Sequence, residues 1–565
     1  MALLPSADKQ PPVADTKSKP ESSSGDDAAT VEVHSGSESE PRDATAEEMA
    51  RFPHVADRLP FAVWAVIVAG AAERFTYFGL IAPWQNYMQN PRDSQGVPGA
   101  LGLGQATASN IYNAFFLFSF LTPMAFALVA DIWLGRYKTL LMGLVLYLLG
   151  CLALVTSSLP SSLDAGAGIG GLVAALILVG LGAGSVKATF FPLLGDQYVQ
   201  QKPQLIRRRN GKVVIVDGER TLQLMYNLYY WFTNIASLSS IPVTFLEIRY
   251  HFWAAYLLAT AALCLSIVLF LVWSTKLRKV PAQGNVLPDA VRVMVLAARS
   301  GFKLDHSKAS YQAANYTSTH AARTVPWSDD FVDQIKSGLQ ACRVIFSLLV
   351  FYLCINQMYN NLVSQAGQMR LGAVPNDMIQ AFSGVACIVL GPPIQALYEL
   401  LARYKIGFGP VARISVAFLF LAAAMAYAAG VQTLIYAAGP CFDRPGACEA
   451  SVPGAGKPGV AVPVATGNDV SVWVQMPVYV LIAVAEILGF VTAFEYAYNH
   501  APADMKTVVQ ALAQLTAGLA SALSMAISPA AQDPHLVVMY ACLAGAMGLS
   551  LVLFWWRFRK YDTST

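Results

Sequence analysis

Charged residues interrupt several long apolar stretches of the sequence, and they are its first candidates for chemistry. Glu73 and Arg74 stand side by side in one stretch, Lys187 lies in another, and Glu486 lies in the middle of a third. An ionisable side chain inside a bilayer costs at least a few kcal/mol unless it is paired or faces a cavity. The four residues therefore indicate either a structural ion-pair network or a pathway for a substrate or an ion, and we favour the pathway.

The types of these residues limit the chemistry that they can perform. Every histidine lies in a tail, in a loop or at the end of an apolar stretch, so carboxyl groups would have to carry any proton. A substrate that breaks a carboxylate–cation pair changes the proton affinity of the carboxyl, which links the proton to the solute. We therefore expect proton coupling at Glu73, Arg74, Lys187 and Glu486. The sequence shows no nucleophile–base spacing and no metal-ligand cluster, so we expect neither an enzyme nor a metal or cofactor.

The composition identifies the class of protein that must position these residues. The chain has 565 residues, of which 55% are hydrophobic and 13% are charged, and its mean hydropathy is +0.47. Soluble domains carry about 25% charged residues. Many windows of the sequence match the ~20 apolar residues that cross a ~30 Å hydrocarbon core as a helix. We therefore predict an all-α polytopic membrane protein, in contact with lipid, and exclude soluble enzymes and nucleic-acid-binding proteins.

Counting the apolar windows gives twelve predicted transmembrane helices in two six-helix halves. The halves are expected at 56–275 and 342–557. The twelve windows are 60–83, 107–130, 138–157, 170–192, 226–247, 253–274, 342–364, 377–400, 411–431, 475–496, 508–528 and 536–557.

Four polar segments separate or flank these halves. Residues 1–55 are rich in acidic residues and poor in large apolar ones, which predicts a disordered acidic tail. Residues 276–341 form a linker that contains an amphipathic stretch near Val286–Ala298. Residues 432–474 form a long Gly/Pro-rich loop, and 558–565 a short basic tail.

The distribution of Lys and Arg predicts the orientation in the membrane. These residues are concentrated in the second-to-third, fourth-to-fifth and sixth-to-seventh connections and in the C-terminal tail, whereas the opposite loops hold scattered cations. The positive-inside rule then places both termini and the linker in the cytoplasm. The 432–474 loop is exterior in this topology, where an oxidising compartment would permit a disulfide between Cys441 and Cys448.

Five motifs, in order along the chain, resemble the proton-dependent oligopeptide transporter family of the major facilitator superfamily. They are Glu73–Gly79, Asp131–Thr139, Gly195–Gln197 after Lys187, Tyr229–Leu238, and Glu486–Lys506. The segment Asn360–Met369 is similar to the fungal di- and tripeptide transporters in particular. The resemblance covers about 55–560, which is all of the chain except the acidic tail.

This resemblance implies proton-coupled uptake of di- and tripeptides across the plasma membrane, by alternating access of two six-helix halves. The substrate site that it implies consists of Arg74, Tyr77, Lys187, Tyr230, Asn234, Tyr479 and Glu486. Arg74 and Lys187 would hold the peptide carboxylate, and Glu486 would pair with the α-ammonium. Charge-assisted hydrogen bonds to both ends of a zwitterion would select peptide length and tolerate different side chains.

The sequence departs from the family pattern at positions linked to coupling and gating. Gly70 stands where the family signature begins with a glutamate, and Phe78 replaces the second signature tyrosine. Asn356 replaces an aspartate that would form a gate salt bridge, and Ala236 replaces a signature glycine. Peptide binding is therefore better supported by the sequence than any particular proton stoichiometry.

Two alternatives remain open from the sequence. The same fold could carry a peptide-like metabolite, with weak coupling or as an exporter, because the changed signature positions would suit a reshaped pocket. A peptide sensor that signals without net transport is the second alternative, with the acidic tail and the linker as signalling elements. We expect the protein to work as a monomer with a small peptide and protons as its partners, and without nucleic acid.

Overall fold

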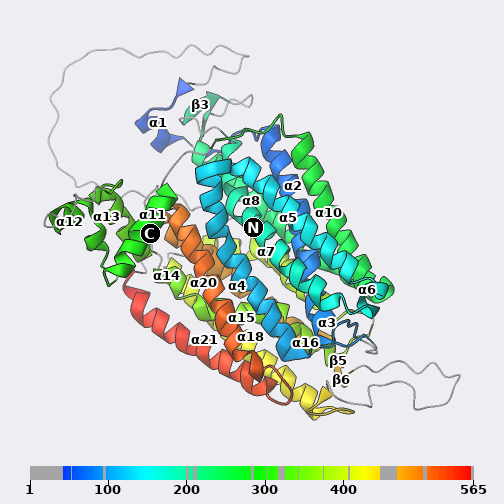
Figure 1. The fold of residues 1–565 in the computed structure, drawn as a ribbon. Helices are drawn as coiled ribbons and strands as arrows, with labels where there is room; N and C mark the ends of the chain where they lie inside the picture. Colours follow the sequence, from blue (N-terminus) through cyan, green and yellow to red (C-terminus); the bar gives the residue numbers. More distant parts are fainter. Residues whose placement is uncertain are drawn as a thin grey trace, which may run out of the picture.

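A computed structural model describes most of the chain, and the described part is mostly helical (Figure 1). The described residues are 42–52, 54–92, 97–198, 203–207, 213–281, 286–301, 303–315, 325–341, 343–372, 374–404, 407–445, 467–500 and 506–561. Within these ranges, nine helical stretches are long and apolar enough to cross a membrane. Large apolar side chains are exposed along outer helix faces, as Val145, Leu271 and Val552 illustrate. The all-α membrane fold is thus confirmed, whereas the count of twelve spans stays a prediction.

The first half of the bundle packs around its own apolar core. Trp84, Tyr112, Tyr147 and Tyr256 are fully buried in that core. The helices are α2 (Phe61–Ile81), α3 (Trp84–Gln89), α4 (Gln105–Val129), α5 (Arg136–Ser157), α6 (Pro160–Asp164), α7 (Gly168–Asp196), α8 (Gly218–Ser237), α9 (Ser240–Tyr250) and α10 (Phe252–Val272).

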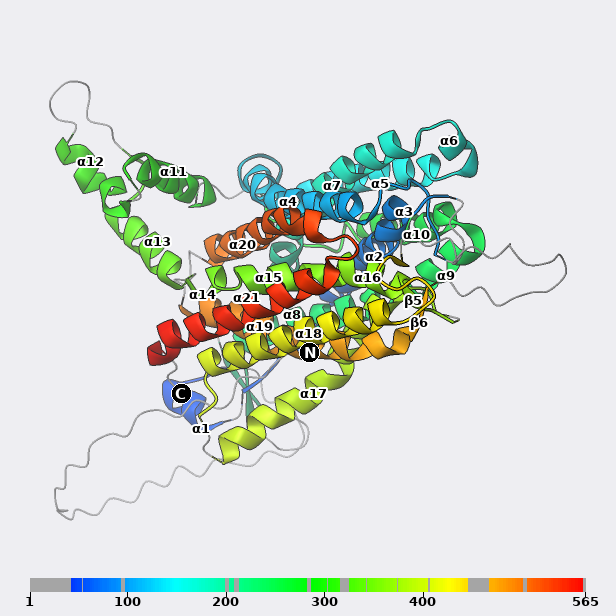
Figure 2. The ribbon, with the colours of Figure 1, turned by 90° about the horizontal axis from the view of Figure 1, so that it is seen from below.

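The second half has a separate core, in which Phe351, Phe418 and Tyr540 are buried. Figure 2 shows the two sets of helices side-on, from below the view of Figure 1. The second set is α14 (Arg343–Phe346), α15 (Leu349–Asn356), α16 (Asn361–Gly367), α17 (Ala381–Arg403), α18 (Pro410–Ala437), α19 (Met476–His500), α20 (Lys506–Ile527) and α21 (Leu536–Phe558).

Two of the predicted spans are divided into shorter helices. The predicted span 226–247 is interrupted after α8, where Ser237 Oγ donates to the Asn234 carbonyl at 2.7 Å. Pro242 then lies in the first turn of α9, where its missing N–H costs no hydrogen bond. The predicted span 342–364 is likewise divided into α14, α15 and α16. Serine hydroxyls that bond to nearby carbonyls compete with the regular helix, and window averaging does not detect this competition.

The last part of the predicted disordered tail is folded. Residues 42–55 form β1 (Arg42–Asp43), α1 (Ala46–Arg51) and β2 (His54–Val55), and the strands join the hairpin β3 (Gln204–Arg207) and β4 (Val213–Val216). The sheet has the order β1-β3-β4-β2. The composition of the tail could not reveal this order, because the hairpin that pairs with it is about 160 residues away in sequence. We call this end of the bundle the sheet end (top of Figure 1).

The linker between the halves folds into helices beside the sheet end (Figures 1 and 2). They are α11 (Val286–Arg299), α12 (Ala309–Asn315) and α13 (Asp329–Ala341), so a helix forms at the predicted amphipathic stretch. Val293 of α11 packs with Val332 and Ile335 of α13, and this cluster reaches Ala513 of α20. The linker is therefore attached to the second half through an apolar contact.

The opposite end of the bundle, which we call the far end, carries α3, α6 and the short strand pair β5 (Met369–Arg370) and β6 (Asn468–Ser471). Helix α18 extends beyond the predicted loop boundary at residue 432 and ends at Ala437. Cys441 takes part in a disulfide bond. Its predicted partner Cys448 lies outside the described residues.

Candidate functional site

Glu73 and Arg74 form a close ion pair on α2. Arg74 Nε donates to Glu73 Oε2 at 2.6 Å, and Arg74 Nη2 donates to Glu73 Oε1 at 2.8 Å. The Arg74 guanidinium also lies 5.0 Å from the centre of the Tyr77 ring. The bidentate pair compensates much of the cost of burying the two charges in the first half.

Lys187 is held differently, although α7 places it near the same pair. Its Nζ donates to Ser119 Oγ at 2.9 Å and lies 4.4 Å from the Phe120 ring centre and 5.3 Å from the Tyr77 ring centre. Within the described ranges, no carboxylate forms an ion pair with this ammonium group. The structural network that would lock α2 to α7 through Glu73 and Lys187 is therefore not formed, and the Lys187 charge remains available.

Glu486 lies on α19 in the second half. The Cys387 thiol donates to Glu486 Oε2 with a separation of 3.7 Å, which is a weak hydrogen bond. Tyr230 and Tyr359 interact electrostatically with the carboxyl group. No cation in the described part of the chain forms an ion pair with Glu486. A carboxyl group without a cationic partner within a transmembrane half is expected to serve a ligand or a proton.

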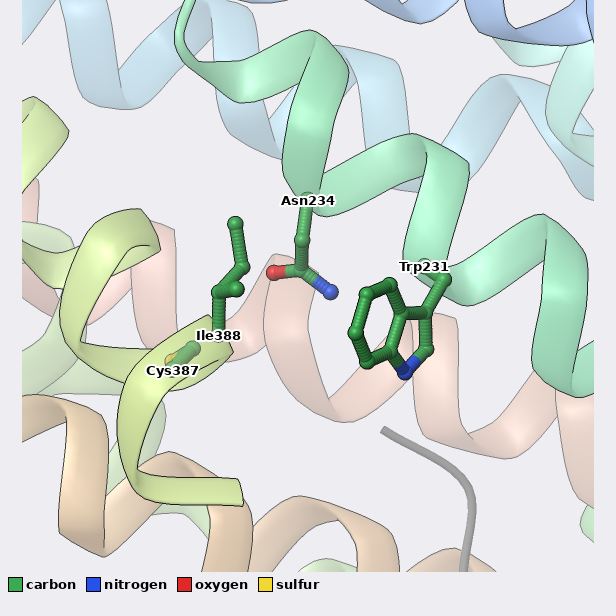
Figure 3. A pocket seen from close by; sticks show the side chains of 4 residues that line it. All are labelled: Trp231, Asn234, Cys387 and Ile388. Carbon is green, nitrogen blue, oxygen red and sulfur yellow. The ribbon is translucent and has the colours of Figure 1, made fainter. Parts of the chain in front are cut away.

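The two halves meet near this carboxyl where α8 faces α17 (Figure 3). Trp231 and Asn234 of α8 and Cys387 and Ile388 of α17 line a small pocket there. Asn234 Nδ2 donates to the backbone carbonyl of Tyr230 at 2.9 Å. The structure thus brings the predicted residue Asn234 to the contact between the halves, one helix away from Glu486.

Tyr359 lies between the cations Arg74 and Lys187 of the first half and the carboxyl of Glu486 in the second half. It was not predicted from the sequence. Its ring centre lies 5.7 Å from that of Phe116 in the first half. It interacts electrostatically with Tyr77, which contacts both Arg74 and Lys187, and with Glu486. The position of this tyrosine directly before the Asn360–Met369 motif was the available signal in the sequence.

Two predicted residues lie apart from this group. Tyr479 is fully buried in the core of the second half, where it interacts with Tyr540, and its hydroxyl has no hydrogen-bond partner among the described residues. Asn356 Nδ2 donates to Ser521 Oγ at 3.1 Å and thereby joins α15 to α20. The roles of Tyr479 in binding and of Asn356 in gating stay predictions.

Gly70, the main departure from the expected proton-coupling pattern, is closely packed. A Cβ atom at this position would lie 2.2 Å and 2.3 Å from two ring atoms of Phe190 and 3.1 Å from Tyr229. The Phe190 and Tyr229 rings stack with their centres 4.3 Å apart. Aromatic packing therefore fills the space that a glutamate side chain would need.

Neutral polar side chains join the two halves at the far end. Asn86 of α3 and Asn376 exchange two amide hydrogen bonds of 2.8 Å. Ser109 Oγ donates to Asn361 Oδ1 at 3.1 Å, and Gln85 Nε2 donates to Ser364 Oγ at 3.2 Å. These contacts hold the two halves together at the far end, away from the charged residues of the site.

Comparison with known proteins gives a consistent result. A profile described as the POT family matches residues 137–544. The chain is 37% identical over 522 residues to a probable peptide transporter of Schizosaccharomyces pombe, covering 92% of this chain and 81% of the relative. It is 36% identical over 547 residues to a peptide transporter of Candidozyma auris, covering 95% and 92%. The fold matches a crystal structure of the POT family transporter PepTSo with a TM-score of 0.68, at 17% identity, over 90% of this chain and all of that chain.

Proposed function

The chain belongs to the POT family, and from this premise we propose that it takes up di- and tripeptides together with protons across the plasma membrane. Relatives that cover more than 90% of the chain are described as peptide transporters, which supports this proposal. Alternating access of the two halves is the mechanism that their separate cores and the contacts between them suggest.

The observation that carries the proposal is the separation of opposite charges between the halves. Lys187 in the first half presents an ammonium that has no carboxylate partner among the described residues, with Arg74 nearby. Glu486 in the second half presents a carboxyl that forms no ion pair with any described cation. A zwitterionic peptide that places its carboxylate near Lys187 and its ammonium near Glu486 would pair both charges and draw the halves together.

We infer that the sheet end faces the cytoplasm and that the far end faces the outside. The connection 131–138, the strands β3 and β4 and the linker helices α11, α12 and α13 lie toward the sheet end, and they belong to the connections that are rich in Lys and Arg, which agrees with the positive-inside rule. Both termini would then be cytoplasmic. The far-end contacts between the halves suit a carrier that is closed toward the outside.

We assign proton binding to Glu73 and Glu486. Arg74 and Lys187 are the cations whose pairing changes when the peptide carboxylate binds. Glu73 is paired with Arg74 and Glu486 has no described ion pair, so the two carboxyls have different environments. The proton gradient would be the driving force, without a cofactor. A monomer suffices, because one chain supplies both halves of the site.

The two alternatives have less support. A peptide-like metabolite without an ammonium group would leave Glu486 without a partner. A sensor would share the binding site, but the relatives are described as transporters. Uptake of a simple peptide therefore separates the proposal from both alternatives.

Uptake of labelled dialanine by a yeast strain that lacks its own peptide transporters tests the proposal. The external solution is held at about pH 5.5 so that a proton gradient exists, with and without a protonophore. We expect saturable uptake that collapses when the protonophore is added. Uptake that persists down its concentration gradient would contradict proton coupling, and no uptake by protein at the cell surface would contradict peptide transport.

A further inference from the structure

Two carboxyl groups meet inside the contact between the halves, at the far end of the bundle. Glu247 belongs to α9 in the first half, and Asp377 directly precedes the short 3-10 helix η4 (Met378–Gln380) in the second half. Each residue is 1% exposed. Neither belongs to the group of charges around Arg74, Lys187 and Glu486.

The surroundings of this pair favour a shared proton. The two carboxyl groups interact electrostatically where α9 contacts the segment around η4. Two ionised carboxylates are both acceptors, so a hydrogen bond between them can form only when one carboxyl is protonated and donates. Asn86 Nδ2 donates to Glu247 Oε1 at 3.4 Å, whereas Glu247 Oε2 and Asp377 Oδ2 have no described donor. A shared proton would supply the missing donor.

The described surroundings of the pair contain no compensating cation. The titratable group that interacts with both carboxyls is Tyr256 of α10, an uncharged phenol, and the Tyr87 ring of α3 packs against Tyr256. Among the described residues, no Lys or Arg interacts electrostatically with either carboxyl. The nearest cation in sequence, Arg249, is exposed and lies over the Tyr250 ring. Two negative charges would therefore repel each other here without screening.

The position of the pair links its protonation to the closed far end. Asn86, which donates to Glu247, also exchanges amide hydrogen bonds with Asn376, the residue before Asp377. The carboxyl pair and the amide pair thus form one polar cluster across the two halves. Separating the halves would break both pairs and expose them to water on the same side.

We propose that Glu247 and Asp377 form a proton-binding site that closes the far end of the transporter. One proton from the outside solution occupies the pair when the halves meet, and it returns to that solution when the halves separate. This proposal rests on the proposed function for its meaning in transport. The proton controls closure and is distinct from the protons assigned to Glu73 and Glu486.

The sign of the effect follows from the closed structure. Acid outside favours the protonated pair and hence the closed far end, whereas alkaline solution removes the proton and favours opening. The variant Glu247→Gln removes the need for a bound proton, because the glutamine amide can donate a hydrogen bond to Asp377 at any pH. Closure of this variant should not depend on the external pH.

Labelling of a reporter cysteine from the outside tests the proposal. Ser109→Cys places a thiol at a fully buried far-end position between the halves, and a membrane-impermeant maleimide reaches it when the far end opens. The labelling rate is compared at about pH 5.5 and about pH 7.5 in the reporter protein and in the reporter protein with Glu247→Gln, so that the intrinsic reactivity of the thiol cancels. Protein without Ser109→Cys provides the background.

We expect the rise in labelling with pH to be about tenfold larger in the reporter protein than in the Glu247→Gln variant. Asp377→Asn should behave like Glu247→Gln, which guards against a folding defect of one variant. Asp533→Asn is the matched control, because this far-end carboxylate bonds to Gln368 and Tyr436 within the second half. It should keep the pH dependence of the reporter protein.

An equal rise in the reporter protein and in both pair variants would overturn the proposal. The labelling requires no peptide, so its result is separate from that of dialanine uptake. Labelling that depends on pH through this pair, without dialanine uptake, would support this site and contradict peptide transport. Dialanine uptake, with labelling that does not depend on the pair, would support peptide transport and contradict this site.

Discussion

At the residue scale, the site is defined by Lys187 and Glu486, two charges that form no ion pair with any described residue. Glu73 and Arg74 neutralise each other, while Lys187 bonds to a serine and Glu486 to a thiol. Burying a charge without a partner costs stability, and such groups are found at functional sites because a ligand completes them. The cost is compensated when a zwitterion binds.

Gly70 allows a test of the packing around this site. Gly70→Ala adds a Cβ atom 2.2 Å from the Phe190 ring, and overpacking of this kind typically costs about 1–3 kcal/mol. We expect the variant in detergent to unfold at a lower temperature than wild type. The matched control is Gly170→Ala, where an added Cβ meets no atom within 4 Å. An equal melting temperature for Gly70→Ala and wild type would show that the Phe190 ring moves aside freely.

The same crowding bears on a variant that would restore the family signature. Glutamate at Gly70 would restore the family signature, and a steeper dependence of uptake on pH would then be expected. In this protein the stacked rings of Phe190 and Tyr229 occupy that space. A loss of function in Gly70→Glu would therefore report on packing rather than on coupling.

Individual residues of the site were predictable from their charge, and others were not. Arg74, Lys187 and Glu486 were recognisable because ionisable residues are rare in apolar stretches. Tyr359 and Cys387 were missed because an aromatic ring or a thiol in a membrane helix has packing as its default role. The hydroxyl of Tyr479 points into a core, and only tertiary packing reveals that.

At the element scale, the linker is attached to the helical bundle by a narrow apolar face. Val293 of α11 is fully buried against α13, whereas Val295 on the same helix is 48% exposed. An amphipathic helix is stabilised mainly by such a face, because its intrinsic propensity contributes little.

These two valines give a matched pair of variants. Val293→Glu buries a charge between α11 and α13, so we expect faster cleavage of the linker by a protease in solution, by about tenfold. Val295→Glu places the same charge in an exposed position and should leave the cleavage rate near that of wild type. Equal cleavage of the two variants would contradict the packing of α11 against α13.

Helix boundaries were predictable to within a few residues where hydropathy alone sets them. The first predicted span, 60–83, corresponds to α2 (Phe61–Ile81), and the last, 536–557, to α21 (Leu536–Phe558). Hydropathy failed at Ser237, where α8 ends and α9 begins three residues later, and at residues 42–55, where a distant hairpin supplies strand partners.

At the scale of the whole molecule, the contacts between the halves define one state of the transport cycle. Neutral amides and hydroxyls form the far-end contacts, and the carboxyl pair Glu247–Asp377 lies among them. Such contacts can break and reform in water at little net cost, as an alternating carrier requires.

A chemical bridge across the far end tests this view of the cycle. A short bifunctional thiol reagent applied to Asn86→Cys/Asn376→Cys should hold the halves together and reduce dialanine uptake by about tenfold or more. Cleavage of the bridge should restore uptake. The control is Gln368→Cys/Gln432→Cys, because these two side chains bond at 2.7 Å within the second half. Full uptake by the bridged Asn86–Asn376 variant would show that the far end need not open.

The most direct test of the proposed binding site is whether Glu486 pairs with the α-ammonium of the peptide. Binding of dialanine and of N-acetyl-dialanine, which lacks the ammonium, is measured by calorimetry on purified wild type and Glu486→Gln. A charged hydrogen bond is worth about 2 kcal/mol, so acetylation should weaken wild-type binding by roughly 30-fold. Because Glu486→Gln lacks the carboxylate that pairs with the ammonium, acetylation should weaken binding to this variant by less than about threefold. An equal loss in both proteins would contradict a site that holds the two ends of a zwitterion between its halves.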